Sequence, residues 1–251
     1  MHKVIILGSS NAISTTGHEN THMVIVGADR MVLVDCVGNS IQRLEQAGLD
    51  FNNLTDIVIS HFHPDHVSGL PLLLMDMWLM GRTGTINIHG LDHTLDRVED
   101  MMKLYSWSEW PGFYPVIFHR LPETETCVVL DCQDFKVWAS PVRHLIPTIG
   151  LRFDFHKTGK ALAYSGDTEP CTEVVRLANG ADILIHEAAG EQTGHSSAAQ
   201  AGEIASKAEV AALYLIHYPT GRFASGDPLA AARRKYQGEI SLARDFMVLE
   251  L

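Results

Sequence analysis

One stretch constrains this chain more than any other, namely His61-Phe62-His63-Pro64-Asp65-His66. It holds three imidazoles and one carboxylate, and it directly follows the apolar run 56–60, which predicts a buried strand. Imidazole nitrogen and carboxylate oxygen are ligands that zinc and similar divalent ions accept. A turn that presents several of them at a strand end therefore predicts a metal site. The alternative is a polar loop whose histidines only cap the backbone.

Length and charge narrow the classes of protein that the chain can belong to. With 251 residues, 46% of them hydrophobic, it can bury a large core, and we expect one domain over residues 1–251. The net charge of −11 offers no broad basic face and disfavours extensive wrapping of nucleic acid. The four cysteines form no CxxC pair, which is typical of reduced thiols. No segment has the length of a signal peptide or a membrane span, so we expect a cytoplasmic protein that binds no membrane.

Hydrophobic periodicity predicts a regular succession of elements. Strands are expected at 3–7, 22–26, 31–35, 56–60, 85–89, 116–118, 127–130, 135–140, 149–155, 160–164, 183–186, 210–216 and 246–250. Helices are expected at 39–48, 67–80, 91–105, 169–178, 195–207 and 227–235. Two strand-rich halves bordered by helices predict an α/β fold, a four-layer αββα sandwich.

Three further residues extend the metal hypothesis. His144, Asp167 and His217 each come just after an apolar strand-like run, with Gly or Pro close by to turn the chain. Each of them alone is more often a structural polar group with its hydrogen bonds satisfied. Together with the opening motif, however, they supply enough ligands for a dinuclear site.

These residues carry a resemblance to a known family. The chain resembles the metallo-β-lactamase-fold hydrolases, and within them the ribonuclease Z-like phosphodiesterases. The segments that carry it run in the family's order: Leu7-Gly8-Ser9-Ser10, Val34-Asp35-Cys36, 61–70, Tyr164-Ser165-Gly166-Asp167-Thr168, Ile185-His186-Glu187-Ala188-Ala189, Gly194-His195-Ser196-Ser197 and His217. The resemblance implies two divalent metal ions, with zinc expected and manganese or iron as alternatives. It assigns His61, His63 and His144 to one ion, Asp65, His66 and His217 to the other, and Asp167 to both.

Glu187 and His195 are the more discriminating pair. The resemblance implies that the carboxylate orients the histidine near a scissile phosphate, although Ala189 and Ser197 stand where the family has threonine. A carboxylate also fixes the tautomer of an imidazole and raises its basicity, so that it can donate to a phosphoryl oxygen or a leaving group. The alternative is that the pair only ties two loops together. In the expected mechanism, Asp65 orients a metal-bridging hydroxide that attacks in line.

The substrate is expected to be small. Ribonuclease Z enzymes usually carry an inserted basic arm that grips RNA, and the segment 140–167 leaves little room for one. With the acidic balance, this favours a small phosphodiester over RNA. The alternatives are a ribonuclease Z-type endonuclease for transfer-RNA 3′ ends, a hydrolase of carboxylic esters, lactones or thioesters with the same fold and, from a different class, a non-catalytic metal-binding module.

Two apolar segments and the remaining histidines complete the predictions. The methionine-rich run 67–80 is expected to be a buried helix, with a substrate wall or a homodimer face as the alternative. The aromatic segment 105–114 is expected to fill core in part and otherwise to line a pocket or an interface. Surface or structural roles are expected for His2, His18, His22, His89, His93, His119, His156 and His186.

Overall fold

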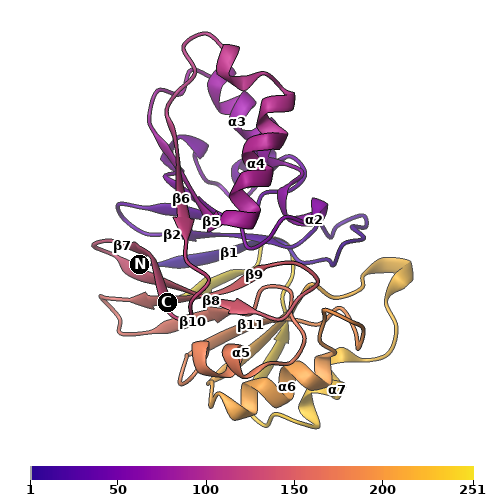
Figure 1. The fold of residues 1–251 in the computed structure, drawn as a ribbon. Helices are drawn as coiled ribbons and strands as arrows, with labels where there is room; N and C mark the ends of the chain where they lie inside the picture. The colour runs from indigo at the N-terminus through magenta and orange to yellow at the C-terminus, as the bar shows by residue number, and fades with distance from the viewer. Residues whose placement is uncertain (1) are drawn as a thin grey trace.

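Two seven-stranded sheets pack face to face in the computed structural model, which describes residues 2–251 (Figure 1). The first sheet has the order β14 (Val248–Glu250), β1 (Lys3–Gly8), β2 (His22–Val26), β3 (Met31–Val34), β4 (Asp56–Val58), β5 (Ile86–Leu91) and β6 (Val116–Leu121). Its strands are antiparallel from β14 to β3 and parallel from β3 to β6.

The second sheet is also mixed. Its order is β13 (Glu239–Leu242), β12 (Ala212–Ile216), β11 (Ile183–Glu187), β10 (Ala161–Tyr164), β9 (Thr148–Phe155), β8 (Phe135–Val142) and β7 (Cys127–Asp131). The strands from β10 to β13 are parallel, and those from β7 to β10 are antiparallel. The carboxyl ends of β10, β11 and β12 therefore lie side by side at one edge of the sandwich.

Both faces of the central strands are buried. In β1, Val4 and Ile6 belong to the core between the sheets, whereas Ile5 and Leu7 belong to the core under the helices. Because side chains alternate along a strand, a strand that is covered on both faces is apolar at every position. This is why the sequence shows continuous apolar runs instead of alternation.

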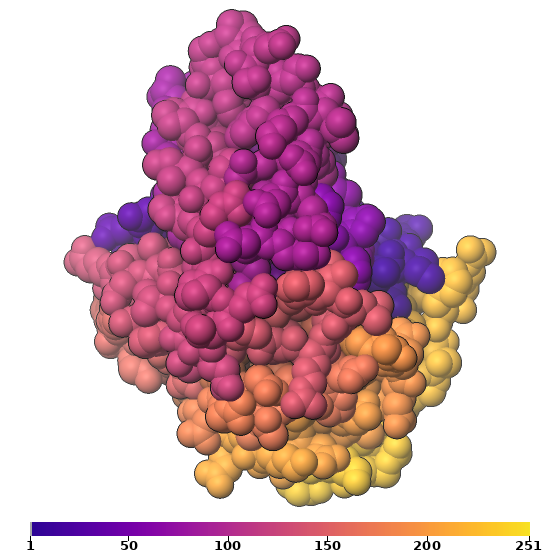
Figure 2. Space-filling view, in the orientation of Figure 1, coloured from indigo at the N-terminus to yellow at the C-terminus, as the bar shows by residue number. Residues whose placement is uncertain are grey.

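Helices cover the outer face of each sheet (Figure 1). On the first sheet lie α1 (Ser40–Gln46), α3 (Leu70–Leu79) and α4 (Asp92–Leu104), and on the second lie α5 (Thr172–Leu177), α6 (Ala198–Lys207) and α7 (Pro228–Arg233). The predicted four-layer αββα sandwich is thus confirmed. Short 3-10 helices occupy Phe51–Asn53, Trp107–Glu109 and Gly221–Phe223. Figure 2 shows that α3, α4 and the chain leading to β6 form a lobe above the rest of the surface. Among residues 2–251, every helix is too short or too polar to cross a bilayer.

The main departures from the predicted elements concern the starts of two helices and one missed strand. The helix expected at 67–80 begins only at Leu70, after the separate short helix α2 (Pro64–Val67), because Pro71 in the first turn of α3 has no N–H to bond the carbonyl oxygen of Val67. The helix expected at 195–207 begins at Ala198, where Ser197 and Gln200 form a capping box. Strand β13 was not predicted at all, because its residues are half-exposed and mixed in polarity.

The aromatic segment 105–114 packs mainly onto the first sheet's outer core. Trp110 stacks on Trp78 with ring centroids 5.1 Å apart, and the buried Tyr114 hydroxyl donates to the carbonyl oxygen of Leu74 at 3.0 Å. Trp110 also lines a hollow of about 230 Å³ together with residues of α3. The expectation of core filling and the expectation of a pocket wall are each met by part of the segment.

Candidate metal centre

The candidate ligands gather where several strands end. His61 follows β4, His144 follows β8, Asp167 follows β10 and His217 follows β12 directly. The structure brings together all seven residues that the sequence analysis singled out as ligands, in two groups. Within each group, one ligand atom per residue lies within 4.8 Å of the others.

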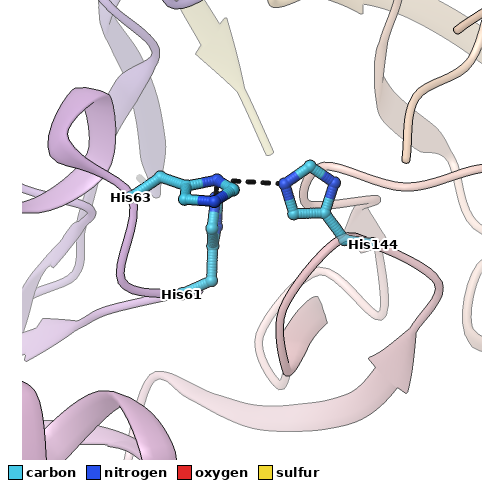
Figure 3. A group of neighbouring side chains, drawn as sticks. All are labelled: His61, His63 and His144. Atoms are coloured by element: carbon cyan, nitrogen blue, oxygen red, sulfur yellow. Dashed lines mark hydrogen bonds between the residues drawn. The ribbon is translucent and has the colours of Figure 1, made fainter. Parts of the chain in front are cut away.

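The first group, which we call the histidine group, consists of His61, His63 and His144 (Figure 3). Nδ1 of His63 lies 3.0 Å from Nε2 of His61 and 3.1 Å from Nε2 of His144. Nitrogens bound tetrahedrally to one zinc ion stand roughly 3.3 Å apart, given bonds of about 2.0–2.1 Å. The three nitrogens therefore face a common point at nearly the spacing that a metal ion requires.

Neighbouring polar groups and burial set the tautomer, orientation and protonation of these imidazoles. Nδ1 of His144 donates to the carbonyl oxygen of Gly194 at 2.6 Å, which leaves its Nε2 unprotonated and turned toward His63. Nδ1 of His61 lies 3.1 Å from the Ser60 hydroxyl. Burial lowers the pKa of His61 well below its usual range and also lowers the pKa of His63 and His144. The group is thus kept neutral, as metal-binding imidazoles must be.

The second group, which we call the carboxylate group, consists of Asp65, His66, Asp167 and His217. Nε2 of His217 lies 3.4 Å from Oδ2 of Asp65 and 3.3 Å from Oδ2 of Asp167. Nε2 of His66 lies 3.5 Å and 3.4 Å from the same two oxygens. All members except Asp65 are buried. Burial opposes charge on Asp65, but its contacts with His217 and His66 outweigh it and lower its pKa below the usual range.

Two orphaned atoms indicate that a cation fits here. Among the described residues, neither Nε2 of His66 nor Oδ1 of Asp167 has a hydrogen-bond partner, although both are buried. Buried polar atoms are nearly always paired, and a divalent ion is a partner that suits both. Asp167 also lies within ligand distance of His144 and His195, which places its carboxylate between the two groups. The residues present therefore fit two divalent ions that share Asp167.

Asp35 is a functional candidate to which the sequence analysis assigned no role. Its Oδ2 lies 2.8 Å from Nδ1 of His66, and its carboxylate accepts hydrogen bonds from the backbone and hydroxyl of Ser60 at 2.8 Å and 2.9 Å. Burial lowers the pKa of His66, but the charges of Asp167 and Asp35 outweigh burial and raise it well above its usual range. The available signal was an acid directly after the apolar strand β3.

Backbone strain marks the same place. Asp35 and His217 adopt the left-handed conformation, with φ of 60° and 54°, which is uncommon for residues other than glycine. Such strain persists where the surrounding structure holds a functional side chain in position. Here it turns one side chain toward His66 and another toward Asp65 and Asp167.

Glu187 and His195 meet beside both groups. Oε1 of Glu187 lies 2.9 Å from Nδ1 of His195 and accepts the backbone N–H of Thr168 at 3.0 Å, while Oε2 accepts the N–H of Ala189 at 2.9 Å. Burial raises the pKa of the Glu187 carboxyl, while these three donors favour its ionised form. Burial lowers the pKa of His195, but the hydrogen bond and charge of Glu187 outweigh burial and raise it. The His195 ring lies 4.9 Å from that of His144.

Known proteins share this arrangement of elements. A sequence profile described as Beta-lactamase superfamily domain matches residues 30–218. The chain is 28% identical to the ribonuclease Z of Porphyromonas gingivalis, over 88% of this chain and 89% of that protein. It matches the crystal structure of human tRNase Z, short form, with a TM-score of 0.79 at 25% identity, over 99% of this chain and 98% of that one. It matches the metallo-beta-lactamase fold protein YhfI from Bacillus subtilis with a TM-score of 0.81 at 22% identity, over 100% of both chains.

The alignment with the Porphyromonas protein also shows a difference in length. The alignment is 276 positions long and contains 88% of this 251-residue chain, about 221 residues. At about 55 of its positions, therefore, the Porphyromonas protein has a residue and this chain has a gap. The profile nevertheless covers well over half of the chain and reaches from β3 to the residue after His217. The chain therefore belongs to the beta-lactamase superfamily and is a metal-dependent hydrolase of the metallo-β-lactamase fold.

Proposed function

We propose that this protein hydrolyses small phosphodiesters with two divalent metal ions held at the candidate metal centre. One observation carries the proposal, namely the Glu187–His195 pair at 2.9 Å, which lies against both ligand groups. Attack on a phosphodiester places negative charge on the phosphoryl oxygens and on the leaving oxygen. A protonated histidine held by a buried carboxylate can neutralise that charge or deliver a proton.

The chain's own residues position the attacking water, the phosphoryl group and one of the metal ligands. When bound, the two ions supply a water acidified to near neutrality and positive charge for the phosphoryl oxygens. Asp65, ionised through its contacts with His66 and His217, accepts a hydrogen bond from the attacking water and directs it in line. His195 keeps Nδ1 on Glu187 and turns its other ring nitrogen to the substrate. Asp35 holds His66 in the orientation in which Nε2 faces the ion.

We infer zinc as the metal. Five of the seven proposed ligands are histidines, and the donor set contains no thiolate. Imidazole with a minority of carboxylate oxygen suits zinc best among abundant divalent ions, with manganese or iron as the alternatives. Metal analysis of protein purified without added metal tests the identity.

The argument for a small substrate rests on what the chain has between β8 and β9. Residues 143–147 connect these strands, residues 156–160 connect β9 to β10, and within the described residues 2–251 no inserted arm extends from the segment 140–167. The alignment with the Porphyromonas ribonuclease Z leaves about 55 positions without a counterpart. A chain of net charge −11 without an added basic arm has little with which to hold a folded RNA.

A second candidate, a ribonuclease Z-type endonuclease, is favoured by the names of the relatives. Proteins named ribonuclease Z match between 85% and 100% of this chain. The same centre would serve both reactions. Cleavage of a precursor transfer RNA at its 3′ end, faster than hydrolysis of any small diester, would select this candidate.

The test of the main proposal uses methyl p-nitrophenyl phosphate with p-nitrophenyl acetate as the carbonyl-ester comparison. The protein is expected to hydrolyse the diester in a chelator-sensitive way and to prefer it to the acetate. His195→Gln should keep both metals and lose about 10²- to 10³-fold in turnover. His156→Gln, at an exposed position distant in the fold, is the matched control. Full diesterase activity in His195→Gln, or hydrolysis of the acetate alone, would overturn the proposal.

A further inference from the structure

An ion pair lies two hydrogen bonds away from the proposed ligand His217. Asp245 belongs to residues 243–247, which connect β13 to β14, and its side chain is only 6% exposed. Its carboxylate pairs with the guanidinium of Arg43 from α1, and Nε of Arg43 donates to the carbonyl oxygen of Leu7 in β1 at 2.9 Å. The pair therefore joins three segments that are far apart in the sequence.

Asp245 accepts two further hydrogen bonds, both from the loop of residues 9–21 that follows β1. Oδ1 accepts the hydroxyl of the fully buried Ser9 at 2.7 Å, and Oδ2 accepts the backbone N–H of Glu19 at 2.9 Å. Removing an ion pair from water can cost as much free energy as the attraction between its charges returns, so such a pair is a weak source of stability. What the charge of Asp245 does supply is one fixed position for Ser9.

The ring of His217 lacks the support that other histidines of the centre have. Nδ1 of His66 lies 2.8 Å from the Asp35 carboxylate. Nδ1 of His144 donates to the carbonyl oxygen of Gly194. Nδ1 of His217, by contrast, is buried and has no hydrogen-bond partner among the residues that the structure describes. A metal-binding imidazole is normally held in orientation through its second ring nitrogen, so the orientation of His217 has to come from its backbone.

Ser9 holds this backbone. Its carbonyl oxygen accepts the N–H of His217 at 3.0 Å. The φ angle of His217 is 54°, in the left-handed region, and such a conformation persists only where surrounding contacts hold it. In this conformation Nε2 lies 3.4 Å from Oδ2 of Asp65 and 3.3 Å from Oδ2 of Asp167. Two hydrogen bonds thus connect Asp245, through Ser9, to the strained backbone of a proposed ligand.

We propose that Asp245 is a positioning residue of the candidate metal centre, which holds the His217 imidazole in place through Ser9. The donors around its carboxylate fix Ser9, and the carbonyl oxygen of Ser9 fixes the left-handed backbone that directs Nε2 of His217 toward the carboxylate group. The assignment rests on the proposed function, in which His217 is a metal ligand. The competing role for Asp245 is to tie down the C-terminal segment alone, in which case the side chain of His217 does not respond to its charge.

The first test observes the imidazole of His217 by NMR in the full chain, with and without zinc. Its Cε1–Hε1 signal is identified by its absence from His217→Ala. Asp245→Asn keeps the shape of the side chain and removes its charge, so we expect the signal to shift or broaden, and Ser9→Ala, which removes the connecting hydroxyl, should do the same. Asp134→Asn is the matched control and should leave the signal unchanged. Asp134 is also a buried aspartate that joins two loops, accepting the N–H of Asp29 at 2.9 Å, but it lies at the opposite end of β8 from the centre.

The second test measures metal affinity by competition with a chromogenic chelator. Asp245→Asn should weaken binding about tenfold at the site that His217→Ala also weakens, and should leave the other site unchanged, since groups that orient metal ligands typically contribute 10- to 100-fold in affinity. In a His217→Ala background, Asp245→Asn should cause no further loss, because it acts through the missing side chain. A role in folding alone predicts the same loss in both backgrounds.

Failure of the inference and failure of the function are distinguishable. If the His217 signal is the same in wild type, Asp245→Asn and Ser9→Ala, or if the loss of affinity is equal in both backgrounds, Asp245 does not position His217. Neither readout depends on hydrolysis, so a wild type that binds both ions and cleaves no diester would overturn the proposed function alone. If His217→Ala costs the protein no metal, the ligand role of His217 fails, and the NMR comparison by itself decides whether Asp245 positions this side chain.

Discussion

The histidine group and the carboxylate group lie at one edge of the same sandwich but differ in charge and burial. The histidine group offers three neutral imidazoles, and two of its three members are only partly buried. The carboxylate group brings two negative charges, and three of its four members are fully buried. Asp35 adds a third carboxylate directly behind His66.

This difference implies unequal roles for the two ions. Buried like charges destabilise a fold unless a cation neutralises them, so an ion in the carboxylate group contributes to the stability of this edge. An ion in the histidine group brings uncompensated charge to neutral ligands and relies on Asp167 for balance. We therefore expect the ion in the carboxylate group to be held more tightly and the ion in the histidine group to be exchanged more readily.

The largest effect is expected from Asp167→Asn, because this carboxylate is the one that the two groups share. Losing its charge should release the metal ion from both groups. Diester turnover should fall by about 10³-fold or more, since metal ions supply several kcal/mol of transition-state stabilisation. Metal content and turnover measure this directly. Asp154→Asn, on the outer face of β9, is the control. If Asp167→Asn retains two metal ions, Asp167 does not bridge them.

The pair His66→Ala and His63→Ala tests the inequality of the groups. His66→Ala leaves three carboxylates facing one another in a buried space, so we expect it to lose stability by several kcal/mol. His63→Ala removes a half-exposed imidazole and should retain one ion per chain with little change in stability. Urea unfolding and metal analysis of both variants provide the comparison. Equal losses would show that the two groups are alike.

Asp35→Asn tests the carboxylate behind His66 without replacing a member of either group. The substitution keeps the shape of the side chain and removes the charge that holds His66, and changes of this kind typically weaken metal binding by about 10- to 100-fold. Competition with a chromogenic chelator should show weakening of one site only. Equal weakening of both sites would mean that Asp35 does not act through His66.

The smallest expected effect is in proton release. In metal-free protein, burial keeps the pKa of the His61 imidazole well below its usual value, whereas Asp167 and Asp35 overcome burial and keep the pKa of His66 well above it. At pH 7 His66 therefore carries a proton that a metal must displace, and affinity at the carboxylate group should fall as pH falls below this raised pKa. Calorimetric titration with metal, in buffers of different ionisation heat, measures the protons released per ion bound. We expect about one for His63→Ala, which retains His66, and about none for His66→Ala. The reverse order would contradict these charge assignments.

The sequence predicts which residues gather at the candidate metal centre better than it predicts the groups that support them. Candidate ligands at strand ends are visible because His144, Asp167 and His217 each come just after an apolar run. The role of Asp35 depends on a left-handed backbone that turns its side chain toward His66, and residue type alone does not reveal this. The carbonyl oxygen of Gly194, which orients His144, has no side chain to detect.

Element boundaries were missed where hydrophobic composition alone does not decide them. The apolar run 67–80 has the composition of one helix, yet α3 begins only at Leu70, with Pro71 in its first turn. Strand β13 is an edge strand of four residues in which only register with β12 imposes extended structure.

His186, expected to be a surface or structural group, is fully buried, and burial lowers its pKa to about 4.

A dinuclear zinc centre is tested by anomalous diffraction from crystals grown with zinc, measured at the zinc absorption edge. We expect two peaks per chain, one about 2.1 Å from the converging nitrogens of His61, His63 and His144 and one at the same distance from Nε2 of His66 and of His217. Asp167 should contact both. A single peak, or two peaks of which neither touches Asp167, would contradict it.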